Sequence, residues 1–234
     1  MPPEIEIKLR ISDTNAFLLA LKRLGARPLG RGTGRVHESN VLFDTPEGDL
    51  GKRGQLLRIR TQTAEAMPAT AKRKSSTKSG TKSGTKSRRA PEKHFLLTFK
   101  RPLAASGSRS AGAQENHRHK VREELELEVT DSAALSRIFE GLGMRGWFRY
   151  EKRRTTFRLP SSSTWAKDLL IELDETPIGT FVELEGPPTA IDLAARKLGF
   201  SPQDYILENY LALCVEDCRR RGVEPTDMVF GPAK

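Results

Sequence analysis

Charged and apolar residues alternate near the start of this chain, and this pattern restricts the possible folds more than any other part of the sequence. From Glu4 to Ile11 the sequence reads EIEIKLRI, so that Glu4, Glu6 and Lys8 share one face while isoleucine and leucine occupy the other. Successive side chains of a β-strand point to opposite faces, and this period of two predicts a strand. Any fold must therefore cover its apolar face and provide surroundings that tolerate its charged one.

The same alternation recurs along most of the chain and predicts a sheet. We expect further strands at residues 40–44, 55–61, 95–101, 120–130, 148–159, 169–174 and 180–185. We expect helices from Ser12 or Asp13 to Leu24, from Asp131 to about Gly143, near 190–198, and from about 203 to 221. Together these elements predict an α+β fold in which helices pack on an antiparallel, strand-dominated domain.

Ionisable residues occur in series on one face of most of the expected strands. Beyond the first strand they include Arg58 with Arg60, Lys100, Arg122 with Glu124 and Glu126, Lys152 with Arg154, Glu172 with Asp174, and Glu183 with Glu185. The plain interpretation is that these are solvent-exposed faces of half-buried strands. However, neighbouring glutamates on one face repel each other unless a cation lies between them. If the helices cover the apolar faces, the sheet closes into a barrel with its charges inside.

A charged lumen of this kind needs a ligand that satisfies charges of both signs. Clustered carboxylates provide the oxygen ligands that Mg²⁺ and Mn²⁺ prefer, and clustered arginine and lysine bind phosphoryl oxygens. The combination predicts a metal-bound polyphosphate. Because the sequence contains no GxxxxGK[ST] motif, side chains on strands would hold the phosphates rather than the N-terminus of a helix.

Several short motifs along the chain occur in the order known from one protein family. They are EIEIK at Glu4–Lys8, NVLFD at Asn40–Asp44, LRIR at Leu57–Arg60, LTFK at Leu97–Lys100, REELE at Arg122–Glu126, KRR at Lys152–Arg154, DETPIGTFVELE at Asp174–Glu185 and NYL at Asn209–Leu211. In this order they resemble the CYTH family, also called triphosphate tunnel metalloenzymes. Two positions depart from the family pattern: Leu42 stands where an aromatic residue is expected, and Asn209 replaces a serine.

The resemblance implies an eight-stranded antiparallel β-barrel with a charged interior and helices outside, a triphosphate substrate, and Mg²⁺ or Mn²⁺ as cofactor. The implied metal ligands are Glu4, Glu6, Glu124, Glu126, Glu183 and Glu185. The implied triphosphate-binding residues are Lys8, Arg58, Arg60, Lys100, Arg122, Lys152 and Arg154. Asp174 would orient a basic residue or help to place a second metal, and it joins Glu4, Glu6, Lys8, Glu183 and Glu185 as an expected catalytic residue.

The activity we expect is metal-dependent hydrolysis of a triphosphate, namely inorganic tripolyphosphate or a nucleoside or thiamine triphosphate. One alternative is a class IV adenylate cyclase, which converts ATP to cyclic AMP and pyrophosphate. Another is a non-catalytic module that binds polyphosphate or nucleotide, although a pure anion binder gains nothing from extra carboxylates. Hydrolysis is preferred because water is always available, whereas cyclisation needs an oriented nucleoside site and no residue indicates an adenine pocket.

The net charge of +10 is concentrated in one segment. Residues 72–93 contain nine basic residues and one acidic residue, and all but Lys93 lie in a stretch, 64–92, that we expect to be a disordered insertion. No aromatic residue interleaves with these charges, so binding to nucleic acid is not favoured. Residues 104–119 are expected to form a second loop insertion, in which His117 and His119 are solvated. We therefore expect one domain over 1–222, with residues 223–234 as a C-terminal tail.

Other features of the sequence argue against a membrane or secreted protein. No run of about 18 apolar residues occurs, and the start, MPPEIEIKLR, lacks the apolar stretch of a signal peptide. We accordingly expect a cytoplasmic protein that does not bind membranes. Cys214 and Cys218 lack metal-ligand spacing and are expected to be free thiols on a helix face. The residues expected to serve in packing alone are Trp147, Trp165, Tyr205 and Tyr210.

Overall fold

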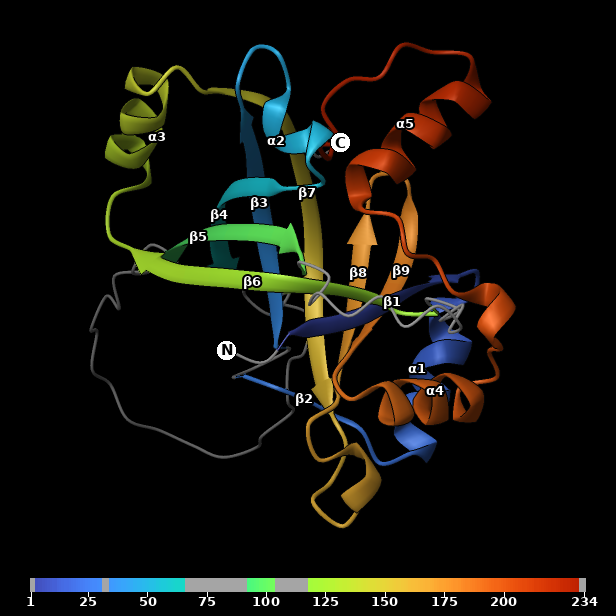
Figure 1. The fold of residues 1–234 in the computed structure, drawn as a ribbon. Helices are drawn as coiled ribbons and strands as arrows, with labels where there is room; N and C mark the ends of the chain where they lie inside the picture. Colours follow the sequence, from blue (N-terminus) through green and yellow to red (C-terminus); the bar gives the residue numbers. More distant parts are fainter. Residues whose placement is uncertain (1–2, 31–33, 66–91, 104–117, 232–234) are drawn as a thin grey trace, which may run out of the picture.

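The computed structural model describes residues 3–30, 34–65, 92–103 and 118–231 (Figure 1). Its strands are β1 (Glu4–Ile11), β2 (Arg27–Pro28), β3 (Arg35–Asp44), β4 (Leu56–Ala64), β5 (Lys93–Pro102), β6 (Lys120–Val129), β7 (Arg145–Arg158), β8 (Leu170–Thr176) and β9 (Gly179–Glu185). Every strand that the alternation predicts is present, and β3, β4, β5, β7, β8 and β9 each extend beyond their predicted range at one end or both. The short β2 was not predicted.

The strands form one sheet that closes on itself. Their order is β2-β7-β3-β4-β5-β6-β1-β9-β8, and β7 also pairs with β8. This last pairing joins the two ends of the row into a closed barrel of eight antiparallel strands, while β2 pairs only with the end of β7. The predicted eight-stranded antiparallel barrel is therefore confirmed.

The register of the strands places charged residues opposite one another on the inner face. Lys8 on β1 lies opposite Glu183 on β9, and Lys100 on β5 lies opposite Glu124 on β6. Opposite charges at directly facing positions of two strands attract each other. The alternating residues of each strand therefore place their charged side chains inside the barrel and their apolar side chains outside it.

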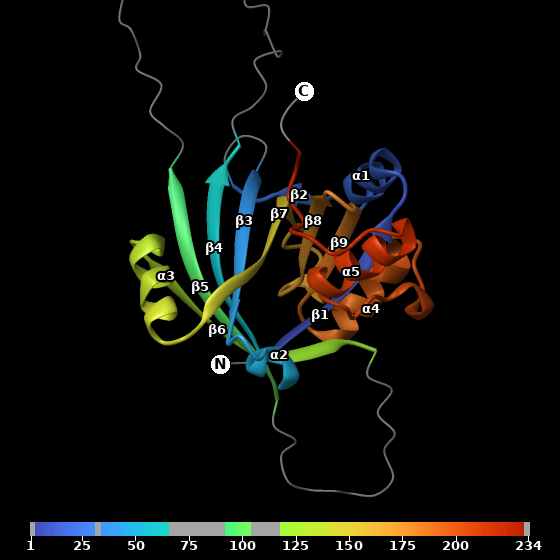
Figure 2. The same ribbon diagram turned by 90° about the horizontal axis from the view of Figure 1, so that it is seen from above.

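Two helices cover the apolar outer face of β1, β8 and β9 (Figure 2). They are α1 (Thr14–Arg23) and α4 (Pro188–Lys197). Ile7 and Leu184, which are fully buried, belong to the same cluster as Leu21 of α1 and Ile191 of α4. Because apolar area is removed from water on both the sheet and the helices, this contact is the main hydrophobic core.

A third helix, α3 (Ser132–Gly141), packs outside β4 and β7. Asp131 caps it, as the sequence predicts, by accepting hydrogen bonds from the backbone N–H groups of Ala133 and Ala134. The ring of Phe139 packs edge-to-face on Phe43, with their centroids 5.2 Å apart. The outer face of this side of the barrel thus has its own, smaller core.

A short helix, α2 (Asp49–Lys52), follows β3 and was not predicted. It is held by Asp44, whose carboxylate oxygens accept hydrogen bonds from the backbone N–H groups of Leu50 and Gly51 at 2.8 and 2.9 Å. The described chain also contains two 3₁₀ turns, η1 (Thr164–Ala166) and η2 (Pro202–Asp204).

The last helix, α5 (Tyr210–Arg221), begins later than the sequence predicts and packs differently from the others. The chain before it is occupied by η2 and by a backbone pair between Ile206 and Lys8, at 2.9 Å in both directions. Asn209 then caps the helix by accepting from Ala212 N at 2.9 Å. The helices α1, α3 and α4 lie outside the barrel. By contrast, α5 packs against Phe148 of β7 and Phe181 of β9, which lie on the inner faces of these two strands together with their charged residues.

The segment after α5 runs beside β7. Met228 donates its backbone N–H to Arg149 O at 2.9 Å and accepts from Glu151 N at 2.8 Å. This part of β7 precedes the residues that pair with β8, which begin at Arg153. The C-terminal segment therefore supplies hydrogen bonds where β8 does not reach.

The predicted insertions lie mostly outside the described residues, at 66–91 and 104–117. At their edges the chain is part of the barrel. Ala64 is the last residue of β4, and Glu65 forms an ion pair with Arg153 at 3.0 Å. In the described chain, no helix is long and apolar enough to cross a membrane.

Candidate active site

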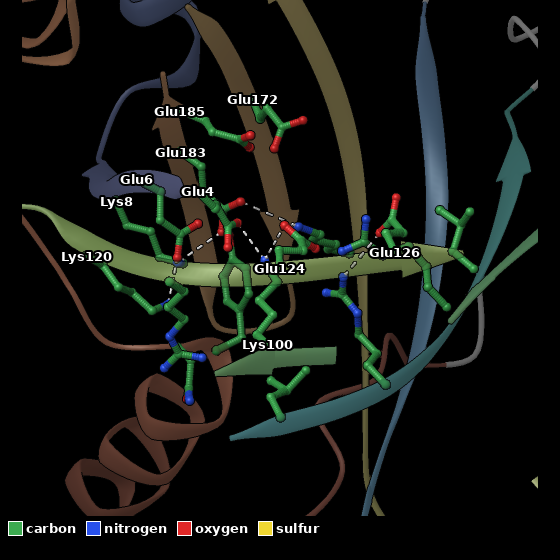
Figure 3. A pocket seen from close by; sticks show the side chains of 18 of the residues that line it. Glu4, Glu6, Lys8, Lys100, Lys120, Glu124, Glu126, Glu172, Glu183 and Glu185 are labelled. Atoms are coloured by element: carbon green, nitrogen blue, oxygen red, sulfur yellow. Dashed lines mark hydrogen bonds and ion pairs between the residues drawn. The ribbon is translucent and has the colours of Figure 1, made fainter. Parts of the chain in front are cut away.

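A cavity of about 680 Å³ lies inside the barrel (Figure 3). Its charged lining residues come from seven strands and are Glu4, Glu6, Lys8, Arg58, Arg60, Lys100, Lys120, Arg122, Glu124, Glu126, Lys152, Arg154, Glu172, Glu183 and Glu185. Every site residue that the sequence predicts is among them except Asp174. The barrel thus gathers into one space side chains that are far apart in the sequence.

Asp174 lies on the inner face of β8 but is fully buried by its neighbours and does not line the cavity. Its carboxylate accepts hydrogen bonds from Lys152 Nζ at 2.8 Å, from Arg154 Nε at 2.7 Å and Nη2 at 2.6 Å, and from the hydroxyl of Tyr210 at 2.6 Å. Of its two expected roles, this geometry fits the orientation of basic residues.

Lys8 lies between two glutamates of the inner face. Its Nζ is 3.0 Å from Glu183 Oε1 and 3.4 Å from Glu6 Oε1. Burial lowers the pKa of Lys8, but attraction to Glu183 and Glu6 outweighs burial, so the pKa is raised. Lys120 Nζ donates to Glu6 Oε1 at 2.6 Å as well. Glu6 and Glu183, both expected as metal ligands, are therefore already engaged by cations.

The two arginines of β4 differ in their partners. Arg58 donates to the hydroxyl of Tyr150 and to Thr98 Oγ1, each at 3.0 Å, and Glu126 Oε2 lies 4.0 Å from its Nη2. Arg60 donates through Nε to Asn40 Oδ1 at 3.0 Å, and the same nitrogen lies 3.3 Å from Oε2 of the buried Glu38. The neutral partners of Arg58 orient its guanidinium while leaving its positive charge available to an anion.

Carboxylates outnumber their cationic partners at one end of the cavity. Lys100 forms ion pairs with both Glu4 and Glu124, and Arg154 forms one with Glu172. Burial, together with repulsion from Glu172 and Glu4, raises the pKa of Glu185 to about 8. Burial also raises the pKa of Glu4, against the attraction of Lys100, whose Nζ lies 2.5 Å from Glu4 Oε1. Figure 3 shows Glu172, Glu183 and Glu185 directed into the same part of the cavity. This end of the cavity is short of positive charge.

The donor set at this end fits a hard divalent cation. Glu4 Oε2 is buried without a hydrogen-bond partner, and no described side chain forms an ion pair with Glu185. Carboxylate oxygens are the preferred ligands of Mg²⁺ and Mn²⁺. Across the described ranges, however, no three potential ligands are already grouped as in a metal site. A cation would draw these carboxylates together and relieve their repulsion.

A smaller cavity of about 170 Å³ adjoins the large one. The residues that line both cavities are Leu42, Leu56, Arg122, Asn209 and Leu211. The smaller cavity is otherwise lined mainly by apolar side chains, including Leu57 and Trp147. We call this space the annex. It was not foreseen from the sequence, where Trp147 was expected to serve in packing alone.

Four other residues of the site were missed or assigned a different role. Lys120 and Glu172 line the cavity, and their places two residues before Arg122 and Asp174 on the same strand faces were usable signals. Tyr150 likewise stands two residues before Lys152, but only the fold shows that its hydroxyl contacts Arg58. Tyr210, expected to serve in packing alone, also donates a hydrogen bond to Asp174 and lines the cavity.

His119 was expected to be solvated, and this expectation is wrong. Its Nε2 lies 2.9 Å from Asp192 Oδ1, and Tyr205 donates its hydroxyl to the same oxygen at 2.9 Å. His119 directly precedes β6, so this contact ties the start of the strand to α4. By contrast, Cys214 and Cys218 are free thiols, as expected, and both are buried.

Comparison with known proteins supports the fold. A sequence model of the CYTH domain matches residues 2–206. The structure is similar to that of a candidate adenylate cyclase from Vibrio parahaemolyticus, with 18% identity, a TM-score of 0.59 and coverage of 89% of this chain and 95% of that one. A conserved hypothetical protein of Pyrococcus furiosus shares 21% identity, with a TM-score of 0.57 and coverage of 90% and 99%.

A protein of Pyrococcus horikoshii is similar to the same degree, with 21% identity, a TM-score of 0.57 and coverage of 90% of this chain and 98% of that one. At such identities the likeness to solved structures concerns the fold. No curated protein matches the chain significantly. The match over residues 2–206, on a closed barrel with a charged lumen, shows that this chain belongs to the CYTH domain family.

Proposed function

We propose that this protein hydrolyses a triphosphate in the lumen of its barrel with the help of Mg²⁺ or Mn²⁺. The observation that supports the proposal is one cavity that gathers many basic side chains and, around Glu185, more carboxylates than cationic partners. A chain of phosphates needs the first, and a divalent cation that accompanies it needs the second. Phosphoryl transfer depends chiefly on positioning and on electrostatic stabilisation, which fixed charges of this kind supply.

The phosphate oxygens would be bound by the basic residues of the lumen. These are Lys8, Arg58, Arg60, Lys100, Arg122, Lys152 and Arg154. Arg58, which is oriented by two neutral hydrogen-bond partners, and Arg60 have planar guanidinium groups that can contact two phosphate oxygens at once. Asp174 and Tyr210 would act behind them, by keeping Lys152 and Arg154 in place.

The cation would be held by Glu4, Glu124, Glu172 and Glu185 at the acidic end. A metal ion bound there would supply Lewis-acid stabilisation of charge on the phosphates and lower the pKa of a bound water. Glu6 and Glu183 would serve instead to position Lys8 and Lys120, whose ammonium groups they contact. The chain's own residues thus divide into ligands for the cation and supports for the anion site.

Cyclisation of ATP is the second candidate. The observation in its favour is the annex, which offers room for a group beyond the phosphates. The charged lumen serves both reactions, because it contacts phosphates whether water or a ribose hydroxyl attacks.

Product analysis tests the proposal. The purified protein is incubated with tripolyphosphate, ATP or thiamine triphosphate, with Mg²⁺ or Mn²⁺ and with EDTA. Metal-dependent release of phosphate supports hydrolysis. Cyclic AMP with pyrophosphate would favour the cyclase instead, and binding without turnover of all three compounds would favour a non-catalytic module.

A further inference from the structure

The annex adjoins the charged lumen but differs from it in chemistry. Leu42, Leu56 and Leu211 line both spaces, and Leu57 and Trp147 are found only on the annex side. The annex therefore lies beside the place where the phosphates of a ligand would bind. A part of the ligand that extends into the annex would meet mainly apolar side chains.

The annex offers little charge for a further phosphate. Arg122 lies at the junction of the two cavities. The carboxylate of Asp44 accepts backbone N–H groups of Thr45, Leu50 and Gly51 at 2.7, 2.8 and 2.9 Å, so its charge is already satisfied. The occupant that matches this lining is an uncharged or weakly charged organic group.

Trp147 reaches the annex through an irregularity in β7. In the pairing of β3 with β7, Leu42 faces Phe148 and Phe43 faces Gly146, so that Trp147 is an extra residue without a partner. A β-bulge of this kind redirects a side chain and occurs often beside active sites. Close packing accompanies it, because a Cβ added at Gly146 would lie only 3.0 Å from Val41 Cγ1.

The exposure of Trp147 sets it apart from the other tryptophan. The side chain of Trp147 is 45% exposed, although a residue of this size normally buries its ring. Trp165, in contrast, packs against the main hydrophobic core. An indole ring left partly open at the entrance of an apolar space offers a stacking surface to a flat heterocycle.

We propose that the annex binds the organic group of a triphosphate ester, with the ring of Trp147 stacked on its heterocycle. The proposal rests on the proposed function and narrows its substrate from triphosphates in general to esters such as nucleoside or thiamine triphosphates. Asn209 and Gln55 line the same space, and their amide oxygens accept hydrogen bonds from Ala212 N and Arg53 Nε. Their NH2 groups can donate to acceptor atoms of the heterocycle.

The first test compares kcat/KM for ATP, thiamine triphosphate and inorganic tripolyphosphate in the wild type and in Trp147→Ala. We expect the ratio of kcat/KM for an ester to that for tripolyphosphate to fall about tenfold or more, chiefly through KM, as loss of one stacking contact predicts. Trp147→Phe, which keeps a ring, should retain most of the ratio. An unchanged ratio for both esters in Trp147→Ala would overturn the proposal.

Leu142→Ala is the matched control. Leu142 is also an exposed apolar side chain, 68% exposed, but it lies just after α3 and lines neither cavity. Its substitution should leave the ratio at the wild-type value. If Leu142→Ala lowers the ratio as much as Trp147→Ala does, the effect is not specific to the annex and the proposal fails.

A second test reads binding without turnover. The chain has two tryptophans, so Trp165→Phe leaves Trp147 as the only indole. Titration of this variant with ATP or thiamine triphosphate should quench the fluorescence of Trp147, and tripolyphosphate should quench it less. An equal response to all three would contradict the proposal. If the wild type hydrolyses none of these compounds, the proposed function fails, while this titration still decides on the annex.

Discussion

Tyr210, the first residue of α5, donates its hydroxyl to Asp174 Oδ2 on β8 at 2.6 Å. The centre of its ring lies 5.3 Å from Lys8 Nζ and 5.1 Å from Lys152 Nζ. A ring face attracts ammonium groups at such distances. Tyr210 therefore helps to hold the cations of the lumen in place, although it lies outside the segment matched by the CYTH domain, which ends at residue 206.

Tyr210→Phe should weaken both the fold and the site. It removes a buried hydrogen bond to a charged group while keeping the ring, and we expect a loss of about 1.5–3 kcal/mol in the free energy of unfolding. A higher KM for the triphosphate should accompany it, because Asp174 loses one of the groups that hold it. Urea denaturation and steady-state kinetics measure the two effects.

Tyr205→Phe is the control for this variant. It also removes a tyrosine hydroxyl bound to an aspartate, in this case Asp192 on α4, outside the lumen. It should leave KM at the wild-type value. An equal rise of KM in both variants would show that the hydrogen bond from Tyr210 to Asp174 does not specifically support triphosphate binding.

Glu185→Gln should impair metal-dependent turnover. Glu185 lies at the acidic end, where a cation would neutralise it, and an amide keeps the size of the side chain but removes its charge. We expect kcat/KM to fall by about 100-fold or more, with a higher Mg²⁺ or Mn²⁺ concentration for half-maximal activity. Glu128→Gln, at a side chain 72% exposed, is the control and should be nearly silent. Near-normal metal dependence in Glu185→Gln would refute the placement of the cation.

The stability of the metal-free protein should fall as the pH rises from about 5 to about 8. The pKa of Glu185 is about 8 in the folded protein and 4.5 ordinarily, so in this range the folded state keeps a proton that the unfolded chain has lost. The folded state then binds more protons, and the free energy of unfolding decreases with pH. The pKa values of Glu4 and Glu172 are raised too and act in the same direction.

Urea unfolding at several pH values in EDTA measures this dependence. Glu185→Gln should make the decline shallower, because the amide does not titrate, and Mg²⁺ should reduce it in the wild type by replacing the proton. Carboxylates with lowered pKa, such as Glu6 and Glu183, titrate below this range and do not mask the effect. A wild-type stability that is flat or rises over this range contradicts the prediction.

Lys152→Met should destabilise the protein strongly. Lys152 is 2% exposed, and its Nζ lies 2.8 Å from Asp174 Oδ2 and 3.6 Å from Glu38 Oε2. Removing one partner of a buried ion pair leaves an uncompensated charge, at a cost of about 3–5 kcal/mol. Lys52→Met, at a side chain 69% exposed, should change the free energy of unfolding little. Comparable denaturation midpoints for the two variants would contradict this account.

Much of the barrel follows from local patterns in the sequence. The alternation at Glu4–Ile11 predicts β1 at the bounds that it has. Asp13 and Asp131 cap α1 and α3 as their positions before apolar helical segments indicate. These predictions hold because the strand period and the helix cap each depend on residues only a few positions apart.

Predictions that depended on distant contacts were less successful. The last helix was expected from about 203, yet its start is delayed to Tyr210 because Ile206 pairs its backbone with Lys8 at the other end of the chain. No local signal near Ile206 carries this information. The short α2 was not predicted because its first turn is held by a side chain of the preceding strand, Asp44, rather than by a cap next to the helix.

Which residues of each strand share a face, and so which charges can meet inside a closed sheet, follows from the sequence alone. The folded barrel was needed to show that Tyr210 reaches Asp174 from the last helix and that a bulge brings Trp147 to the annex. The physical reason is that the pleat of a strand repeats every two residues, whereas the contacts of the lumen depend on register and closure across the whole barrel.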